Sequence, residues 1–396
     1  MPSIIILRSS YPEKRAVINK TNNEYYFRNI RYNPVYALKV IISKINSVVT
    51  KKRSINWDAH AVVSYPLNRS SVIHTFNTIV KTKTKWCSTY ETMIPRTNET
   101  SRRAWKYDDN YTADKYTLRL FELLKQSSCF SIIALSECNY KMQLDYMNKA
   151  KIPDADIIKN KMTVLHPPQE LLTTADEINK KYEIAPICLN LFFVGHELYR
   201  KGGEQILYAL ERLKDKYEFK LTIIGSIESY GDYASRSTKE DSIKISGIIN
   251  SANYLTYYDK LSNEQVLEVA KNSHIGLLPT LADTYGFSVL EMQACGCPVI
   301  STDVRALKEI NNDECGWIIT VPKDFSGEAL FETIEQRALL KKTIEDKLYD
   351  TFTDIFNGKY NLADKALKSM ERIEKHHNPR HYADQLNKIY ASGSRK

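Results

Sequence analysis

Short runs of consecutive apolar residues recur along this chain of 396 residues, and segments with apolar residues at helical spacing separate them. A strand whose residues are nearly all apolar is covered on both faces, as in a parallel sheet flanked by helices. We expect strands at 4–7, 60–65, 71–76, 85–90, 130–135 and 162–166 in the first half, and at 189–195, 220–225, 253–259, 274–280 and 315–321 in the second half, with a further strand opening at 298–300. The alternation predicts an α/β protein with two doubly wound sheets.

The series of strands and helices is interrupted once. His166-Pro167-Pro168 ends the first series, and a polar stretch follows before the second begins. Because the chain exceeds one average domain in length, we predict domains at 1–168 and 169–375, followed by a C-terminal segment at 376–396. Helices are expected at 116–126, 139–150, 202–217, 263–273 and 287–294, and a polar loop at 226–250. Open parallel sheets bind ligands beyond the carboxyl ends of their strands, so we expect a ligand between the two domains.

Charge is divided unevenly between the two halves. Residues 1–165 carry 27 Lys and Arg against 13 Asp and Glu, whereas residues 166–396 carry 29 against 34. The basic half is either an ordinary solvated surface or the part that meets an anion, such as a phosphate-bearing acceptor or an acidic membrane. The basic residues are scattered without interleaved stacking aromatics, so nucleic acid is not an expected partner.

Nothing in the sequence indicates export. No stretch reaches the roughly 18 apolar residues that span a bilayer, and the apolar run near the N-terminus follows no basic residue, which favours a buried strand over a signal peptide. The seven cysteines lack the spacing of a metal site and read as reduced, packed thiols. We therefore expect a cytoplasmic protein that contacts a membrane at most peripherally, through its basic N-terminal domain.

The segment DTYGFSVLEMQACGCPVIST, residues 283–302, holds two carboxylates around an apolar helix. The helix predicted at 287–294 directs its free N–H groups toward the carboxyl edge of the sheet, where they favour an anion. Glu291 lies about one turn into this helix among apolar residues, so its charge needs a partner. That partner is either the two hydroxyls of a ribose, with phosphates over the helix N-terminus, or a basic neighbour.

A second segment, FFVGHELYRKGGEQILYAL, has a strand, a glycine turn at Gly195, then His196, Arg200 and Lys201 before Gly202-Gly203 and a helix. Cations at a helix N-terminus oppose the helix dipole unless an anion lies between them, so Arg200 and Lys201 indicate a bound diphosphate. The other interpretation is an exposed basic loop. The segment is neither a Walker loop nor a GxGxxG fingerprint.

Together these two segments resemble the retaining glycosyltransferases of family 4, which have the GT-B fold of two Rossmann-like domains facing across a cleft. The resemblance is specific over roughly 190–320. It rests on Gly195 through Lys201-Gly202, on Asp283, Gly286-Phe287, Glu291, Ala294, Gly296 and Pro298-Val299-Ile300, which form an acid-x7-acid motif and its continuation, and on Thr302 through Glu309-Ile310 and Gly316 through Ile319. Over the first half only the order of elements is similar.

The resemblance implies a role for each matching residue. Glu291 would hold the ribose of a nucleotide sugar, Lys201 and Arg200 would neutralise its diphosphate, and Asp283 would face the donor sugar. The other residues expected near the donor are Gly195, His196, Lys260, Leu261, Thr284, Tyr285, Gly286 and Phe287. A final helix at 381–390 would return to the first domain, which would bind the acceptor.

This sequence departs from the family pattern at four places. Asp283 stands where Glu is usual and His196 where Arg is usual; the Thr-x-His of the first domain is Thr89-Tyr90-Glu91, and a Gly-Gly pair is missing near Arg305-Ala306. Glu91 is therefore either a catalytic base, a ligand of a sugar hydroxyl, or a salt-bridged residue. His74, at a predicted strand end, has a catalytic or a packing role.

The resemblance thus implies an enzyme that moves a sugar, with retention of configuration, from a nucleotide-sugar donor to a glycan or lipid-linked acceptor. Because the cations and the helix N-terminus stabilise the leaving diphosphate, we expect neither a metal nor another cofactor. Two alternatives remain: an epimerase or phosphorylase on the same scaffold, and an inactive descendant that binds a nucleotide sugar or glycan. The donor, the acceptor and the linkage are not specified by the sequence.

Overall fold

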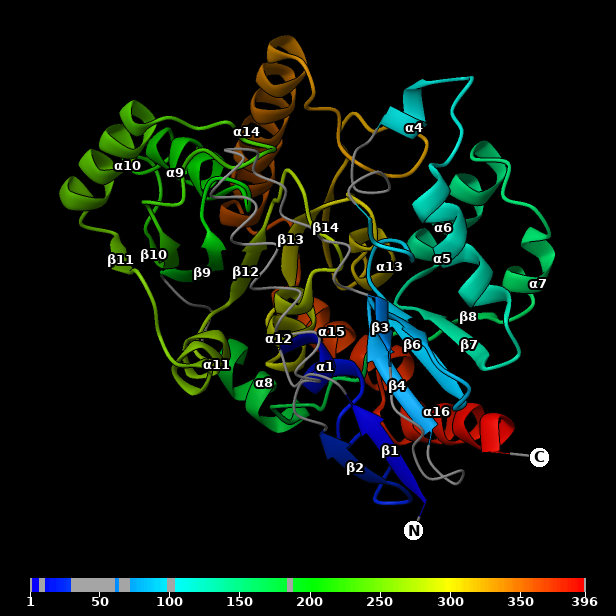
Figure 1. The fold of residues 1–396 in the computed structure, drawn as a ribbon. Coiled ribbons are helices and arrows are strands. Elements are labelled where there is room, and N and C mark those ends of the chain that lie inside the picture. The colour runs from blue at the N-terminus through cyan, green and yellow to red at the C-terminus, as the bar shows by residue number, and fades with distance from the viewer. Residues whose placement is uncertain are drawn as a thin grey trace. The chain divides into compact units, whose positions relative to one another are not determined.

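The computed structural model describes residues 2–6, 11–29, 61–63, 72–97, 104–183 and 188–394. The chain divides into two compact units (Figure 1), a first unit of Met1–Pro168 with Pro379–Lys396 and a second unit of Gln169–Asn378. The division after residue 168 coincides with the boundary expected from the proline pair, and the return to the first unit begins three residues after the expected 376.

A parallel sheet of six strands, in the order β2-β1-β4-β6-β7-β8, forms the centre of the first unit. Its strands are β1 (Ser3–Ile6), β2 (Tyr26–Asn29), β4 (Val72–Phe76), β6 (Trp86–Tyr90), β7 (Cys129–Ala134) and β8 (Met162–Val164). The run at 60–65 is different: β3 (Ala61–Val63) pairs with β5 (Ile79–Lys81) in a separate two-stranded sheet, and residues 60, 64 and 65 lie outside the described ranges.

Helices complete the core of this unit. The helices α1 (Tyr11–Ala16), α5 (Lys115–Lys125) and α6 (Glu137–Lys149) contact the sheet, while α4 (Ala104–Tyr107) packs on α6 and α7 (Ala155–Lys159) packs on α5 and α6. The side chains of Asp114 and Ser136 cap the N-termini of α5 and α6 by accepting backbone N–H groups. Phe121 of α5 stacks on Tyr146 of α6 with ring centroids 5.9 Å apart, and both rings are fully buried.

The last helix, α16 (Pro379–Ser394), belongs to the first unit although it lies more than 200 residues beyond Pro168 in sequence. The hydroxyl of Tyr382 donates to the carbonyl of Ala16, and Asn387 donates to the carbonyl of Thr21 over 3.3 Å. A Cβ at Gly393 would lie 2.5–2.7 Å from the ring of Phe130, so only glycine permits this approach to β7. The helix is therefore an integral layer of the first unit.

The second unit is built on the sheet β11-β10-β9-β12-β13-β14, whose neighbours are all parallel. Its strands are β9 (Leu189–Glu197), β10 (Phe219–Ser226), β11 (Leu255–Tyr258), β12 (Ile275–Leu278), β13 (Val299–Thr302) and β14 (Gly316–Ile319). Counted from β9, the order is 3-2-1-4-5-6, the arrangement of dinucleotide-binding domains. The strand order reverses between β9 and β12, so the crevice that such sheets use for ligands opens at the carboxyl ends of these two strands.

The helices of the second unit are α8 (Ala175–Glu183), α9 (Gly203–Glu211), α10 (Lys239–Ser251), α11 (Asn263–Lys271), α12 (Phe287–Ala294), α13 (Leu307–Ile310), α14 (Ile334–Phe356) and α15 (Leu362–His376). The prediction of a loop over all of 226–250 was wrong, because α10 begins at a capping box of Thr238 and Asp241. Only Ser242 and Ile245 of this helix are buried, so the apolar periodicity is too weak to reveal it. None of the helices in the described ranges is long and apolar enough to cross a membrane.

Candidate functional site

The loop after β9 carries the cations that the sequence singled out. β9 continues through Gly195 and His196 to Glu197, so the prediction of a turn at Gly195 was wrong. The reason is that β10 keeps pairing past this point, with Ser226 opposite Glu197. The chain turns over 198–202 instead and enters α9 at Gly202, whose φ of +85° is readily adopted only by glycine.

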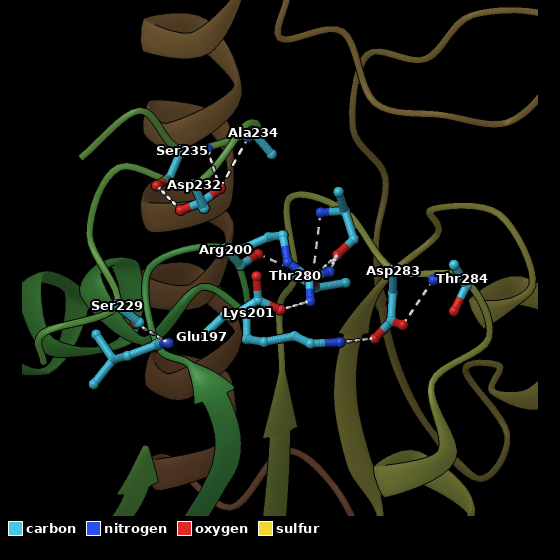
Figure 2. Close-up of polar contacts among 12 residues, drawn as sticks. Glu197, Arg200, Lys201, Ser229, Asp232, Ala234, Ser235, Thr280, Asp283 and Thr284 are labelled. Carbon is cyan, nitrogen blue, oxygen red and sulfur yellow. Dashed lines mark hydrogen bonds and ion pairs between the residues drawn. The ribbon is translucent and has the colours of Figure 1, made fainter. Parts of the chain in front are cut away.

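The loop after β12 is fastened to the loop after β9 by backbone and side-chain hydrogen bonds (Figure 2). The carbonyl of Arg200 accepts from the N–H of Leu281 at 2.9 Å and from the hydroxyl of Thr280 at 3.0 Å. In return the Arg200 guanidinium donates to the carbonyl of Ala282 at 2.6 Å. The two loops on either side of the switch point therefore form one rigid element.

Lys201 and Asp283, 82 residues apart in sequence, meet at this point. Figure 2 shows the Lys201 side chain extending toward Asp283, whose carboxylate accepts a hydrogen bond and forms an ion pair with the ammonium group. The other carboxylate oxygen accepts from the N–H of Thr284 at 2.7 Å. Burial alone would raise the pKa of Asp283, but Lys201, with help from Arg200 and the Thr284 N–H, lowers it below its ordinary value. The carboxylate is therefore charged and oriented.

Arg200 is held by partners of its own. Its second guanidinium nitrogen pairs with Glu197, and its guanidinium carbon lies 5.9 Å from the centre of the Tyr233 ring. Burial would lower the pKa of Arg200, yet the hydrogen bond to Glu197 and the surrounding negative charge raise it. Neither Glu197 nor Thr280 was selected from the sequence. The spacing of three residues between Glu197 and Arg200 is the signal that points to Glu197.

Residues 284–291 continue from the ion pair into α12. Gly286 caps the helix with a φ of +95°, and a Cβ there would collide with Leu307. Tyr285 is buried, whereas Thr284, Phe287 and Glu291 are half-buried, so Glu291 reaches the surface of the helix one turn from its start. The expected anion site at the N-terminus of α12 thus lies beside the Lys201–Asp283 pair.

The other residues predicted to bind the donor lie at the same edge of the sheet but farther from Lys201. His196 is exposed near the end of β9. Lys260, which is exposed, and Leu261, which is half-buried, follow the edge strand β11. β10 separates β11 from β9, so these two residues are two strands away from Lys201.

In the first unit, Glu91 follows β6 and is a member of a small polar cluster. Its carboxylate accepts from Asn77 at 3.1 Å and pairs with Arg96 at 3.0 Å, and its N–H donates to the Asn77 side-chain oxygen at 3.1 Å. These contacts agree with the interpretation of Glu91 as a salt-bridged residue. In a catalytic role, the Glu91 carboxylate would have to bind a substrate as well as Arg96.

His74 lies in the middle of β4 rather than at a strand end, and it is 1% exposed. Its Nδ1 is 2.6 Å from the hydroxyl of Tyr390 in α16, and its Nε2 is 2.8 Å from the hydroxyl of Thr89. Burial lowers the pKa of His74 to about 3, so the ring is neutral at physiological pH. Nδ1 thus joins α16 to the sheet and Nε2 joins β4 to β6, and this use of both ring nitrogens favours the packing interpretation.

No group of three or more His, Cys, Asp and Glu side chains is arranged to hold a metal ion in the parts of the chain that the structure describes.

The middle of the chain is similar to a known family. Residues 175–347 match the family model described as Glycosyl transferases group 1. An uncharacterized glycosyltransferase of Methanocaldococcus jannaschii is 28% identical over 134 residues, which are 34% of this chain and 32% of that protein. The D-inositol 3-phosphate glycosyltransferase of Paenarthrobacter aurescens is 22% identical over 162 residues, 39% and 38% of the two chains. The matches to the curated relatives thus span only about a third to a half of their length.

Similarity to solved structures extends over the whole chain. Sucrose-phosphate synthase from Thermosynechococcus elongatus has a TM-score of 0.56 at 14% identity, covering 99% of this chain and 98% of that one. Anabaena HepE, solved in complex with UDP-glucose, has a TM-score of 0.56 at 11% identity, covering 98% and 99%. The two parallel-sheet units and these neighbours establish the GT-B fold, and the match to the group 1 glycosyl transferases lies within the second unit.

Proposed function

We propose that this protein is a retaining glycosyltransferase of family 4 that moves a sugar from a nucleotide-sugar donor to a glycan or lipid-linked acceptor. The observation that carries the proposal is the meeting of Lys201 and Asp283 at the switch point of the sheet, inside the region that matches the group 1 glycosyltransferases. The UDP-glucose held by the neighbour HepE supports a nucleotide-sugar donor.

In this proposal the donor diphosphate binds between Lys201 and the N-terminus of α12. Lys201 is paired with Asp283, so a diphosphate competes with that carboxylate for the same ammonium group. Arg200 adds positive charge to the site while its guanidinium keeps its bonds to Glu197 and to the carbonyl of Ala282. Together these groups stabilise the charge that develops on the leaving diphosphate, and we propose that they do so without a metal.

The rest of the donor lies along the same edge. Glu291, on the surface of α12, accepts hydrogen bonds from both ribose hydroxyls, and Asp283 turns to the donor sugar. Gly195 and His196 flank the phosphates, and the base lies toward Lys260 and Leu261. The backbone and side chains of Thr284, Tyr285, Gly286 and Phe287 line the sugar side.

The acceptor attacks from the same face that the diphosphate leaves, so the configuration is retained, and a phosphate oxygen of the donor takes the acceptor proton. Glu91 of the first unit holds an acceptor or donor hydroxyl, or assists as base when Arg96 gives way. The basic residues of 1–165 favour an anionic or lipid-linked acceptor and peripheral contact with an acidic membrane, for a protein that works in the cytoplasm.

A second candidate is an inactive GT-B protein that binds a nucleotide sugar or glycan without transferring it. The observation that favours it is that both cations of the site already have carboxylate partners, Glu197 for Arg200 and Asp283 for Lys201. Such pairing weakens the field available to a diphosphate.

A screen of UDP-, GDP- and ADP-linked sugars by thermal unfolding, followed by assay of nucleoside diphosphate release, tests the proposal. A donor that binds the native state raises the unfolding temperature in proportion to ln(1 + [L]/Kd). We expect one donor series to stabilise the protein and to be hydrolysed slowly without acceptor. Stabilisation without release favours the inactive candidate, and no stabilisation by any of the three series contradicts both.

A further inference from the structure

We propose that Gly195 is a positioning residue: because it lacks a Cβ, it leaves the space along the end of β9 through which Lys201 reaches Asp283. The inference rests on the proposed function only where it concerns the diphosphate. The contact between Lys201 and Asp283 is a feature of the fold itself.

The space above Gly195 is filled by the proximal part of the lysine side chain. A Cβ built on Gly195 would lie 2.8 Å from Lys201 Cγ, 3.0 Å from Lys201 Cβ and 3.3 Å from Phe193 Cζ. The Lys201 atoms stand near the root of the side chain, and the N–H of Lys201 donates to the Glu197 carbonyl at 3.0 Å. The root therefore cannot move without opening the turn, so an added methyl group forces a different rotamer and carries the ammonium group away.

Gly195 cannot retreat in the opposite direction. The register between β9 and β10 shifts here, because Val194 pairs with Ile224 while Glu197 pairs with Ser226. Two residues of β9 thus face Gly225 alone, as in a β-bulge. A Cβ on Gly225 would collide with the carbonyl oxygen of Gly195, so the two backbones are already at closest approach.

The position of Lys201 has an electrostatic consequence for Asp283. Asp283 is 8% exposed, and the Lys201 ammonium is the ion-pair partner of its carboxylate. If the ammonium group moves away, only Arg200 and the Thr284 N–H among these groups still oppose the effect of burial, so the pKa of Asp283 rises. A diphosphate bound at the same place would lose one charge-assisted hydrogen bond.

The test is Gly195→Ala, with Gly247→Ala as a matched control. Gly247 lies in α10, and a Cβ there would have no heavy atom within 4 Å. Two quantities are measured: the pKa of Asp283 by carboxyl-carbon NMR, and the affinity for inorganic pyrophosphate by calorimetry. We expect Gly195→Ala to raise the pKa of Asp283 and to weaken pyrophosphate binding about tenfold or more. Gly247→Ala should change neither quantity.

A double-mutant cycle with Lys201→Gly separates positioning from a general effect on folding. Lys201→Gly removes both lysine atoms that the new methyl group meets, so Gly195→Ala should cause no further loss of pyrophosphate affinity in that background. Should Gly195→Ala alone fail to fold, the same double variant should fold again. Additive losses, a double variant that stays unfolded, or an unchanged Asp283 pKa in Gly195→Ala would each overturn the inference.

The failure of the proposed function has a different signature. If pyrophosphate binds neither the parent protein nor Gly247→Ala, while Gly195→Ala still raises the pKa of Asp283, the positioning of Lys201 stands and its role toward a diphosphate does not.

Discussion

At the scale of single residues, the main feature of the candidate site is the ion pair between Lys201 and Asp283. In the proposed reaction Lys201 binds the diphosphate and Asp283 binds the donor sugar. Asp283 is buried and holds the Lys201 ammonium, while its other oxygen is fixed by the Thr284 N–H. The carboxylate therefore keeps the lysine in place and, by the same contact, competes with a phosphate for it. Removing the charge of Asp283 should act in opposite directions on diphosphate binding and on sugar transfer.

Asp283→Asn should bind a nucleoside diphosphate several-fold more tightly than the parent protein, because Lys201 no longer has a carboxylate partner. Turnover of the sugar donor should fall by at least about tenfold, since the amide is a poorer ligand for the sugar and no longer orients the lysine. Calorimetry with the nucleoside diphosphate and a donor-hydrolysis assay measure the two effects. Weaker diphosphate binding in Asp283→Asn would contradict the competition between carboxylate and phosphate.

Of the parts of the donor, Glu291 is predicted to contact the ribose and not the diphosphate. Glu291→Ala should therefore reduce the rise in unfolding temperature caused by a nucleoside diphosphate to about that caused by inorganic pyrophosphate, whose binding should be unchanged, since Lys201 and the N-terminus of α12 stay intact. Glu218→Ala, at an exposed position before β10, is the control and should behave as the parent protein. Equal loss for pyrophosphate would show that Glu291 supports the helix rather than the ribose.

At the scale of elements, His74 joins three parts of the first unit: its own strand β4, the strand β6 through Thr89, and the helix α16 through Tyr390. The ring is buried and neutral, with its pKa lowered to about 3. The titratable neighbours Cys87, Tyr382 and Tyr390 have pKa values raised by burial, so none of them carries charge below neutral pH. His74 is therefore the group of this cluster that responds to mild acid.

The sign of the pH effect follows from the two pKa values. The unfolded chain takes up a proton on His74 near pH 6.5, whereas the folded chain resists it until about pH 3. The contribution of His74 is complete above pH 6.5 and is lost as the pH falls toward 3. Between pH 7 and 4.5 the free energy of unfolding of the first unit should decrease by about 2–3 kcal/mol from this group alone.

Hydrogen exchange of peptides from β4 and α16 at pH 7 and pH 4.5 measures this loss. His74→Gln, which keeps a donor and an acceptor but does not titrate, should lose less protection over the same interval. His274 in the second unit, whose pKa burial lowers to about 4, supplies an internal comparison that the substitution leaves unchanged. An identical decrease in the parent protein and in His74→Gln would assign the acid sensitivity to other groups.

Helices and strands are predictable from the sequence where their residues are strongly buried and where glycine or proline marks their ends. α12 was predicted with the bounds that the structure has, because Gly286 and Gly296 flank a short apolar segment. The strand β2 was missed because it is an edge strand with Tyr26 exposed, and α10 because only Ser242 and Ile245 are buried. Lys201 and Asp283 were both selected from the sequence, but their contact was not, since it depends on β9 lying beside β12.

At the scale of the whole molecule, the two units differ in net charge as well as in the site residues that they carry. The sequence from 1 to 165 carries more than twice as many basic as acidic residues, whereas the remainder has a slight acidic excess. The donor-side residues belong to the part with the acidic excess, where Arg200 and Lys201 supply positive charge at the switch point. Affinity for an anionic acceptor or surface should therefore come from the first unit and depend on ionic strength.

Sedimentation with lipid vesicles tests whether the basic first unit binds an anionic surface. We expect the protein to bind vesicles that contain phosphatidylserine and to bind neutral phosphatidylcholine vesicles much less, with binding lost above about 0.5 M salt, where the Debye length falls below about 5 Å. The donor-induced rise in unfolding temperature should persist when vesicles are present, because the Lys201–Asp283 site lies in the second unit. Equal partition onto acidic and neutral vesicles would remove the membrane from the proposal and leave a soluble anionic acceptor as the partner of the basic half.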